Sequence, residues 1–174
     1  MTIHDTFPFA EPADVVRRFR GRLGGAVSLW TAGAEGSRAG LTVSSLVVAN
    51  GDPAHLLGLL DPDADLTEAL RSTGVAVVQL LGAHDRGVAE AFGGSEPSPG
   101  GPFRSAVDWV QGDHGPVLGG RTHALVRLES LREVGWSVLA DVVVEGVHVA
   151  EDDAGLEHRR GRYRSVGGLG KDRS

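Results

Sequence analysis

Short apolar runs, each ended by turn residues, recur along the chain and predict a mainly β protein. The runs are rich in Val and Leu, and Gly, Pro, Asn or Asp residues separate them. Because many of these six or so strands must pair non-locally, we expect a closed or partly closed β-barrel with peripheral helices. The last run is too long for a straight strand, so it should bend or bulge. The runs span residues 26–32, 40–48, 55–60, 74–81, 124–129 and 136–149.

Apolar residues at helical spacing predict three helices outside these runs. The first spans 11–23, with acidic residues early and arginines late, an order that suits the helix macrodipole. The second begins near 65, where Asp63 or Asp65 can cap it. The third covers 84–92. All three are short for regular crossovers between parallel strands, so they belong at the periphery of the barrel.

Length and composition predict one domain over residues 1–174, with a core of about 11–165 and a flexible tail at 166–174. The absence of cysteine excludes disulfides and thiolate metal sites, and it fits a reducing compartment. A net charge of −6 argues against a nucleic-acid surface. No apolar run approaches the ~20 residues of a membrane span, and the first residues lack a secretory signal. We therefore expect a cytoplasmic protein with neither nucleic acid nor membrane as a partner.

Candidate chemistry concentrates in the strand-like run at 40–53. Thr42, Ser44 and Ser45 bring three hydroxyls, and Asn50-Gly51 marks a turn directly after the apolar residues that follow them. One interpretation is an ordinary strand with solvated hydroxyls. The other is a strand end whose hydroxyls and amides hold a phosphorylated planar cofactor.

Other polar motifs are less specific. The seven histidines form no compact ligand pair, so we expect no metal site. Asp113-His114 is either an acid-oriented imidazole or a solvated loop histidine. The glycine pairs make no dinucleotide fingerprint. The basic cluster 159–164 either meets a phosphate or a partner's acidic surface, or is a solvated tail. The acids of 61–65 lack the rest of a calcium loop and suit caps and turns.

The order of these segments resembles the flavin reductase-like family of FMN-binding split barrels. The resemblance runs from about Phe19 to Tyr163. No single segment is diagnostic, whereas their order and spacing are. The matching segments are Val27–Thr31, Gly40–Ser45 followed by Asn50–Pro53, Leu59–Thr67, Val77–Leu81 and His84–Gly93.

The resemblance implies a set of cofactor-binding residues. Thr42, Val43, Ser44 and Ser45 would contact the isoalloxazine or the ribityl chain, with Asn50 and Gly51 close by. The next binding segment corresponds to Asp61, Asp65, Leu66 and Thr67, where we expect contact through the backbone because carboxylates repel phosphate. Arg86 is the candidate phosphate partner, and a salt bridge on an exposed helix is its alternative role. The resemblance assigns no catalytic residue.

The same resemblance implies an oxidoreductase in which NADH or NADPH reduces FMN, or FAD, in a symmetric homodimer. A flavin-accepting monooxygenase is the partner that it suggests. However, many family members have Gly-Asp-His at the start of the long late strand, beside the nicotinamide. Here that place holds Gly135-Trp136-Ser137, and we interpret the earlier Gly112-Asp113-His114 as a coincidence.

Two alternatives therefore stay open beside the reductase. One is a flavin-binding module without reductase turnover, such as a carrier, a sensor or a partner subunit. The other is a barrel for another flat cofactor, such as deazaflavin or haem. Trp136 either stacks on flavin or nicotinamide, or fills the barrel or a dimer contact, and we favour the second role.

Overall fold

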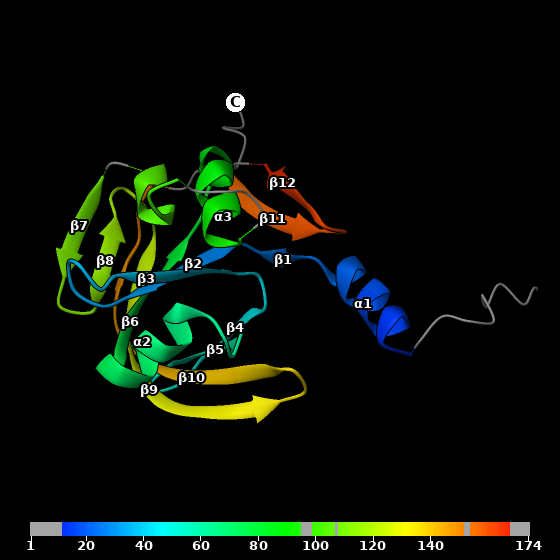
Figure 1. The fold of residues 1–174 in the computed structure, drawn as a ribbon, viewed down its shortest axis with the longest axis horizontal. Helices are drawn as coiled ribbons and strands as arrows, with labels where there is room; N and C mark the ends of the chain where they lie inside the picture. The colour runs from blue at the N-terminus through cyan, green and yellow to red at the C-terminus, as the bar shows by residue number, and fades with distance from the viewer. Residues whose placement is uncertain (1–11, 95–98, 107, 152–153, 168–174) are drawn as a thin grey trace, which may run out of the picture.

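The computed structural model describes residues 12–94, 99–106, 108–151 and 154–167. In this part of the chain, seven antiparallel strands form one sheet in the order β3-β2-β6-β9-β10-β5-β4, which curls into a half-barrel (Figure 1). The predicted barrel is confirmed in this split form. The strands of the sheet are β2 (Ser28–Ala32), β3 (Ala39–Val43), β4 (Leu46–Ala49), β5 (His55–Leu60), β6 (Val75–Leu80), β9 (His123–Val134) and β10 (Ser137–His148).

Helix α2 (Asp65–Thr73) lies inside the curl of this sheet (Figure 1). Its Leu66 and Leu70 are fully buried and pack in one apolar cluster with Trp30 of β2. The indole of Trp30 lies against Gly58 of β5, where a Cβ would come within 2.7 Å of the ring. The main core therefore joins the helix to strands from both halves of the sheet.

Strand β10 has the irregular register that its length predicts. Its pairing with β9 shifts between Asp141 and Val142 and again between Val144 and Gly146. Bulges of this kind bend a strand and increase its twist. The prediction that this run bends or bulges is confirmed, and the bends let one long hairpin follow the curl of the sheet.

A second apolar cluster lies around α3 (Arg86–Phe92), outside the half-barrel. Phe92 meets Phe103 and Trp109 in edge-to-face contacts, with ring centroids 4.8 and 5.9 Å from its own. Trp109 begins a hairpin of β7 (Trp109–Gly112) and β8 (Gly115–Leu118), which the sequence interpretation missed. Short 3₁₀ turns occupy Ala83–Asp85 and Pro102–Ser105.

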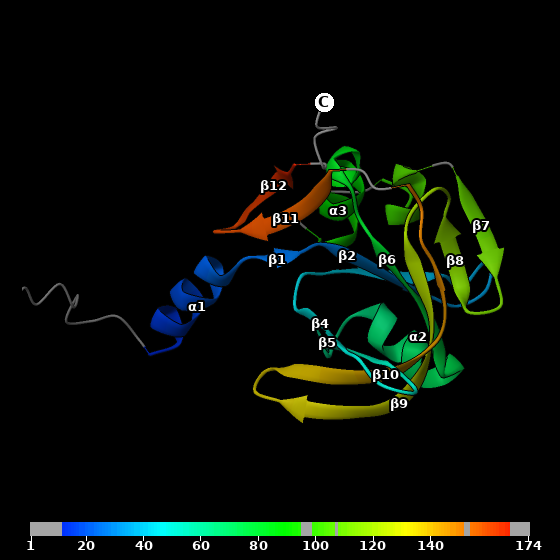
Figure 2. The ribbon, with the colours of Figure 1, turned by 180° about the vertical axis from the view of Figure 1, so that it is seen from behind.

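A third, three-stranded sheet joins distant parts of the sequence. Strand β1 (Gly25–Ala26) pairs with β11 (Gly155–Arg159), which pairs with β12 (Arg162–Val166). Residues 159–164 are thus part of a hairpin, and their interpretation as a tail is wrong. Helix α1 (Pro12–Leu23) precedes β1 and projects from the body beside this hairpin (Figures 1 and 2). Residues 168–174 of the predicted tail lie outside the described part of the chain.

None of the described helices is both long enough and apolar enough to cross a bilayer.

Candidate functional site

A groove of about 770 Å³ opens where α1, the β11–β12 turn and the β3–β4 turn meet. Among the described residues its lining includes six basic side chains and no carboxylate, although the chain as a whole has a net charge of −6. The Glu157 carboxylate lies close by, against Gly24. Anions are therefore the ligands that this surface attracts. The basic lining residues are Arg17, Arg18, Arg20, Arg22, His158 and Arg160, and the hydroxyl-bearing ones are Ser44 and Ser45.

The β11–β12 turn fixes the position of α1. Arg160 and Gly161 are the two residues between these strands, and both have positive φ, 52° and 71°. This is the backbone of a tight type I′ hairpin turn. The N–H of Arg160 donates a hydrogen bond of 2.8 Å to the carbonyl of Gly21 in α1. One side of the groove is therefore tied to the other through the backbone.

Ser44 and Ser45 form the floor of the groove between β3 and β4. The hydroxyl of Ser45 donates to the carbonyl of Leu59 at 3.1 Å, and the N–H of Leu59 donates to the carbonyl of Ser45 at 3.1 Å. Within the described residues, the Ser44 hydroxyl has no hydrogen-bond partner. A Cβ at Gly25 would overlap the carbonyl of Ser44, so this close approach requires glycine. The turn is rigid, and one hydroxyl is available for a ligand.

Thr42 and Val43 support this turn from inside. The Thr42 hydroxyl donates to the carbonyl of Ala89 at 2.8 Å, and the side chain of Val43 is buried in the main core. Asn50 and Gly51 are exposed, and they follow β4 just before the cis peptide of Asp52–Pro53. None of these four residues lines the groove.

The segment 61–67 is held mostly by its own contacts. The Asp61 carboxylate accepts a hydrogen bond from the N–H of Asp63, and its carbonyl accepts one from the Thr67 hydroxyl at 2.7 Å. Leu66 and Thr67 are fully buried, whereas Asp65 is exposed. Neither Asp63 nor Asp65 caps α2, since Ala64 occupies the N-cap without a side-chain bond. That capping prediction is wrong, because the helix begins at Asp65 and Ala64, between the two aspartates, occupies the N-cap position.

Arg86 lies at the start of α3, and its side chain is 65% exposed. Its Nε donates to Glu90 Oε1 at 2.8 Å, at i,i+4 spacing. Arg86 thus forms the salt bridge on an exposed helix that we named as its alternative role. Of the predicted site residues, only Ser44 and Ser45 line the groove.

Sequence reasoning missed the arginines of the groove for two reasons. The arginines of α1 suit the macrodipole, and this local explanation concealed a shared surface. Arg160 belongs to the basic cluster 159–164, for which a phosphate site was one of two interpretations. The two sets of arginines, in α1 and in the cluster 159–164, could have been considered together. They hold most of the chain's arginines outside the predicted strands.

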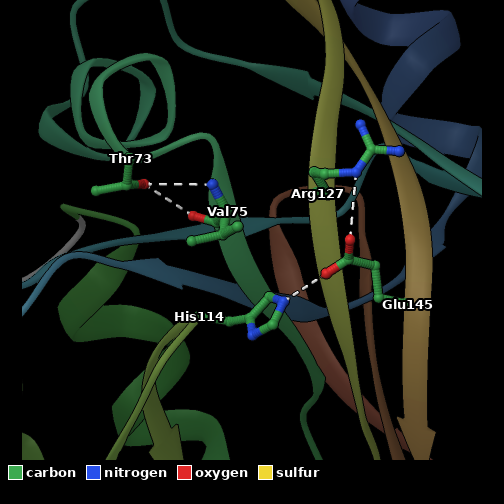
Figure 3. Close-up of polar contacts among 5 residues, drawn as sticks. All are labelled: Thr73, Val75, His114, Arg127 and Glu145. Carbon is green, nitrogen blue, oxygen red and sulfur yellow. Dashed lines mark hydrogen bonds and ion pairs between the residues drawn. The ribbon is translucent and has the colours of Figure 1, made fainter.

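A second polar cluster ties the β7–β8 hairpin to the main sheet (Figure 3). His114 Nε2 lies 2.7 Å from Glu145 Oε2, and Arg127 Nε donates to Glu145 Oε1 at 3.2 Å. The hydrogen bond with His114 and the nearby charges lower the pKa of Glu145 below 4.5, against a smaller opposing effect of desolvation. His114 is therefore oriented by Glu145 and not by its neighbour Asp113. No set of three His, Asp or Glu side chains in the described ranges is arranged to hold a metal ion.

Most of the chain matches the model of a known protein family. The model of the flavin reductase like domain matches residues 20–167. The chain belongs to this family. The flavin reductase like domain therefore includes part of α1, the half-barrel and the β11–β12 hairpin, and hence both sides of the groove.

Individual relatives of this flavin reductase like chain agree with the assignment. The FMN reductase (NADH) RutF of Ancylobacter novellus is 30% identical over 148 residues, which cover 84% of this chain and 81% of the relative. The NADH:FAD oxidoreductase SgcE6 of Streptomyces globisporus has the same fold, with a TM-score of 0.79 at 24% identity over 91% of this chain and 97% of that one. BorF, the flavin reductase component of a bacterial two-component tryptophan halogenase, gives 0.79 at 18% identity, covering 90% and 99%.

Trp136 occupies the tip of the β9–β10 hairpin of this flavin reductase like domain, and it is 88% exposed. The favoured interpretation that it fills the barrel is wrong, because the hairpin extends past the core before it turns. A dimer contact or a ligand contact remains for this ring.

Proposed function

We propose that the protein is an NAD(P)H-dependent flavin reductase that binds FMN, or FAD, at the Ser44–Ser45 end of the arginine groove. One observation carries this proposal. The hydroxyl turn that the family resemblance assigns to flavin opens directly into a groove whose described lining residues include six basic side chains and no carboxylate. The similarity to an FMN reductase (NADH) supports NADH as the electron donor and FMN as the acceptor.

The residues present fit a flavin nucleotide. Guanidinium groups bind phosphate through charge-assisted hydrogen bonds, and the free Ser44 hydroxyl can bond to the ribityl chain or the ring. A bound flavin supplies hydride acceptance, while the protein supplies position and electrostatics. Ser45 both donates a hydrogen bond to Leu59 and accepts one from it, and these two bonds keep the floor of the site in place.

The remaining predicted residues belong to the proposed site in a supporting role. Leu66 and Thr67 are buried, so their contribution would come from the backbone. Thr42 and Val43 anchor the end of β3, directly before Ser44, to Ala89 and to the main core. The members of this proposed outer part are Thr42, Val43, Asn50, Gly51, Asp61, Asp65, Leu66, Thr67 and Arg86.

Anaerobic mixing of the purified chain with flavin and each donor tests this function. We expect the absorbance of oxidised FMN or FAD to disappear over many turnovers with NADH or NADPH. Protein denatured by heat provides the control for direct reaction between donor and flavin. No catalysed loss of absorbance with either donor and either flavin would contradict the proposal.

A second candidate is a flavin-binding module without turnover, which the exposed Trp136 and the adjacent Ser137 favour. The family resemblance places these residues where many members have Asp and His. The double variant Trp136→Asp, Ser137→His restores that pattern at the tip of the β9–β10 hairpin, where Trp136 is exposed and Ser137 is half-buried at the first position of β10, so it should fold. If the natural chain binds flavin but only the variant reduces it with NADH, the protein is a module; if both reduce it, the protein is a reductase.

We also propose that two copies form a homodimer through the apolar face of α1. Val15, Val16, Phe19 and Leu23 are all exposed, although a 12-residue helix is only marginally stable without packing. The helix contains four arginines and one aspartate, a net charge of +3, so the rest of a chain of net charge −6 carries −9. A second copy thus offers the complementary charge.

Light scattering after size exclusion tests the dimer. We expect the mass of two chains, reduced to one chain by Phe19→Asp. The control Val110→Asp, at an exposed position of β7, should leave the dimer intact. A mass of one chain for the natural protein would contradict the proposal.

The proposed acceptor of reduced flavin is a flavin-dependent monooxygenase. BorF serves a halogenase in a two-component system, which supports a separate acceptor enzyme here too. Oxygenase turnover that depends on this reductase and stops without it would test the pairing.

A further inference from the structure

The open end of the β9–β10 hairpin places two histidines side by side. His123 is the first residue of β9, and His148 is the last residue of β10. They are direct partners in the register of the two strands, and their ring centroids lie 5.1 Å apart with the planes tilted by 34°. Neither residue lines the arginine groove. The expectation of no metal site was based on spacing along the chain, which does not reveal a pair across two strands.

His123 is held in the orientation of a metal ligand. Its Nδ1 lies 2.9 Å from the carbonyl oxygen of Arg121, and because a carbonyl can only accept, Nδ1 donates this hydrogen bond. The neutral ring then has its lone pair on Nε2. Metal-binding histidines almost always use their second ring nitrogen in this way. The guanidinium of Arg121 brings no uncompensated charge, since it donates to Asp85 Oδ1 at 2.6 Å.

His148 supplies the second imidazole. It is exposed, and among the described residues its side chain has a ring contact with His123 but no hydrogen bond or ion pair. Its ring can therefore turn without breaking a polar contact. Zn–N bonds are about 2.0–2.1 Å long, so two imidazoles on one tetrahedral ion have centroids roughly 5 Å apart. The observed separation of 5.1 Å thus requires no movement of the strands.

We propose that His123 and His148 together bind one divalent transition-metal ion of the Zn²⁺ class, with water at the remaining positions. Imidazole nitrogen suits zinc, copper and nickel, whereas Mg²⁺ and Ca²⁺ prefer oxygen ligands. No third His, Asp or Glu of the described ranges completes the set. The dissociation constant should therefore be on the order of 1–100 μM, weaker than that of a four-ligand structural site. This inference does not depend on the proposed flavin reductase function.

An ion at this position would clip the two longest strands together at their open end. The pairing of β9 with β10 is irregular nearby, where the register shifts between Val144 and Gly146. A ligand that binds only the folded chain stabilises it by mass action, and a clip that closes a long segment restricts the unfolded chain. We therefore expect zinc to raise the unfolding temperature.

Calorimetric titration of Zn²⁺ into the full chain, without an affinity tag and at about pH 8, tests the site, because a metal displaces the protons of its ligands. The key variant is His148→Gln at the exposed position, and His123→Gln tests the second ligand. His84→Gln is the matched control, an exposed histidine of the turn before α3. Flavin reduction by each variant shows that it is folded, since none of the three histidines belongs to the proposed flavin site. Mg²⁺ is the control ion.

We expect Zn²⁺ to bind the natural chain and His84→Gln alike, and each of the other two single variants to weaken binding at least about tenfold. Because one ion needs both rings, the double variant should bind scarcely less than either single variant. Zn²⁺ at about a hundred times its dissociation constant should raise the unfolding temperature of the natural chain by about 5 °C or more, and leave that of His148→Gln unchanged.

Two results would overturn the inference. One is a zinc affinity of His148→Gln equal to that of the natural chain, which would make the ring contact a packing feature only. The other is a loss of stoichiometry without loss of affinity in the single variants, which would show that the two histidines bind zinc separately. Neither result affects the flavin reductase proposal, because flavin binding and reduction are measured without zinc.

Discussion

The hydroxyl of Ser28 donates a hydrogen bond of 2.7 Å to the carbonyl of Val43, the residue directly before the groove floor. The same hydroxyl accepts a hydrogen bond of 3.2 Å from the indole N–H of Trp30. Ser28 is fully buried. One small polar side chain therefore connects the largest core residue to the end of β3.

Ser28→Ala should destabilise the fold by about 1–3 kcal/mol, because it leaves buried polar groups without a partner. Chemical denaturation would measure the free energy of unfolding. Ser165→Ala, at an exposed position of β12, is the control and should change it little. An unchanged stability of Ser28→Ala would show that the hydrogen bonds of Ser28 do not stabilise the end of β3.

Gly58→Ala should destabilise the fold by about 1–3 kcal/mol through overpacking. The new Cβ would lie 2.7 Å from Cζ2 of Trp30, and this buried ring has no space to move. Gly87→Ala is the matched control on α3, since no atom lies within 4 Å of its Cβ position. It should stabilise the helix by about 0.5–1 kcal/mol. Thermal unfolding of both variants should shift in opposite directions.

Tyr163, the one tyrosine of the sequence, gives a site-specific titration. Burial raises the pKa of Tyr163 above 10.0, and the nearby Glu90 carboxylate adds to this effect. The phenolate absorbance of the folded protein should therefore appear at higher pH than in denaturant. Because the folded-state pKa is the higher one, this stability is present below pH 10.0 and is lost as pH rises through the folded pKa. A shared titration midpoint in the two states would contradict this.

Glu145 should titrate below its ordinary value, because its hydrogen bond with His114 favours the carboxylate. His114→Gln should raise the pKa of Glu145 toward 4.5, and His148→Gln should not. A depressed carboxylate pKa stabilises the fold above the unfolded pKa, and this stability is lost as pH falls through the folded pKa. Carbon-13 NMR of the Glu145 carboxyl group would follow the titration. Equal pKa values in the natural chain and His114→Gln would refute this linkage.

The sequence was most informative where a local pattern matched its tertiary use. The strands at 26–32, 55–60 and 74–81 follow from β-branched and apolar runs between turn residues, and helix α1 spans Pro12–Leu23 where its pattern predicts 11–23. The bulges of β10 followed from length alone. In the strands local preference and burial agree, so the sequence alone was enough to predict them.

Prediction failed where distant segments create the environment. Strands β7 and β8 are only four residues each. Strand β8 is held by hydrogen bonds from the Thr31 hydroxyl to the carbonyl of Pro116 and from the N–H of Leu118 to the side-chain oxygen of Gln79, which no local pattern reveals. Trp136 is exposed although a large aromatic ring normally packs. The arginine groove depends on α1 lying beside the β11–β12 turn, and the partner of each is far away in sequence.

The pairing of β1 with β11 also affects the order in which the chain can fold while it is being synthesised. The arginines of α1 leave the ribosome early, but Arg160 and the turn that receives Gly21 emerge only after the half-barrel has been made. A nascent chain can thus fold its curled sheet while the groove beside α1 is still missing one side. Both sides of the groove are therefore present only after the β11–β12 hairpin has been made.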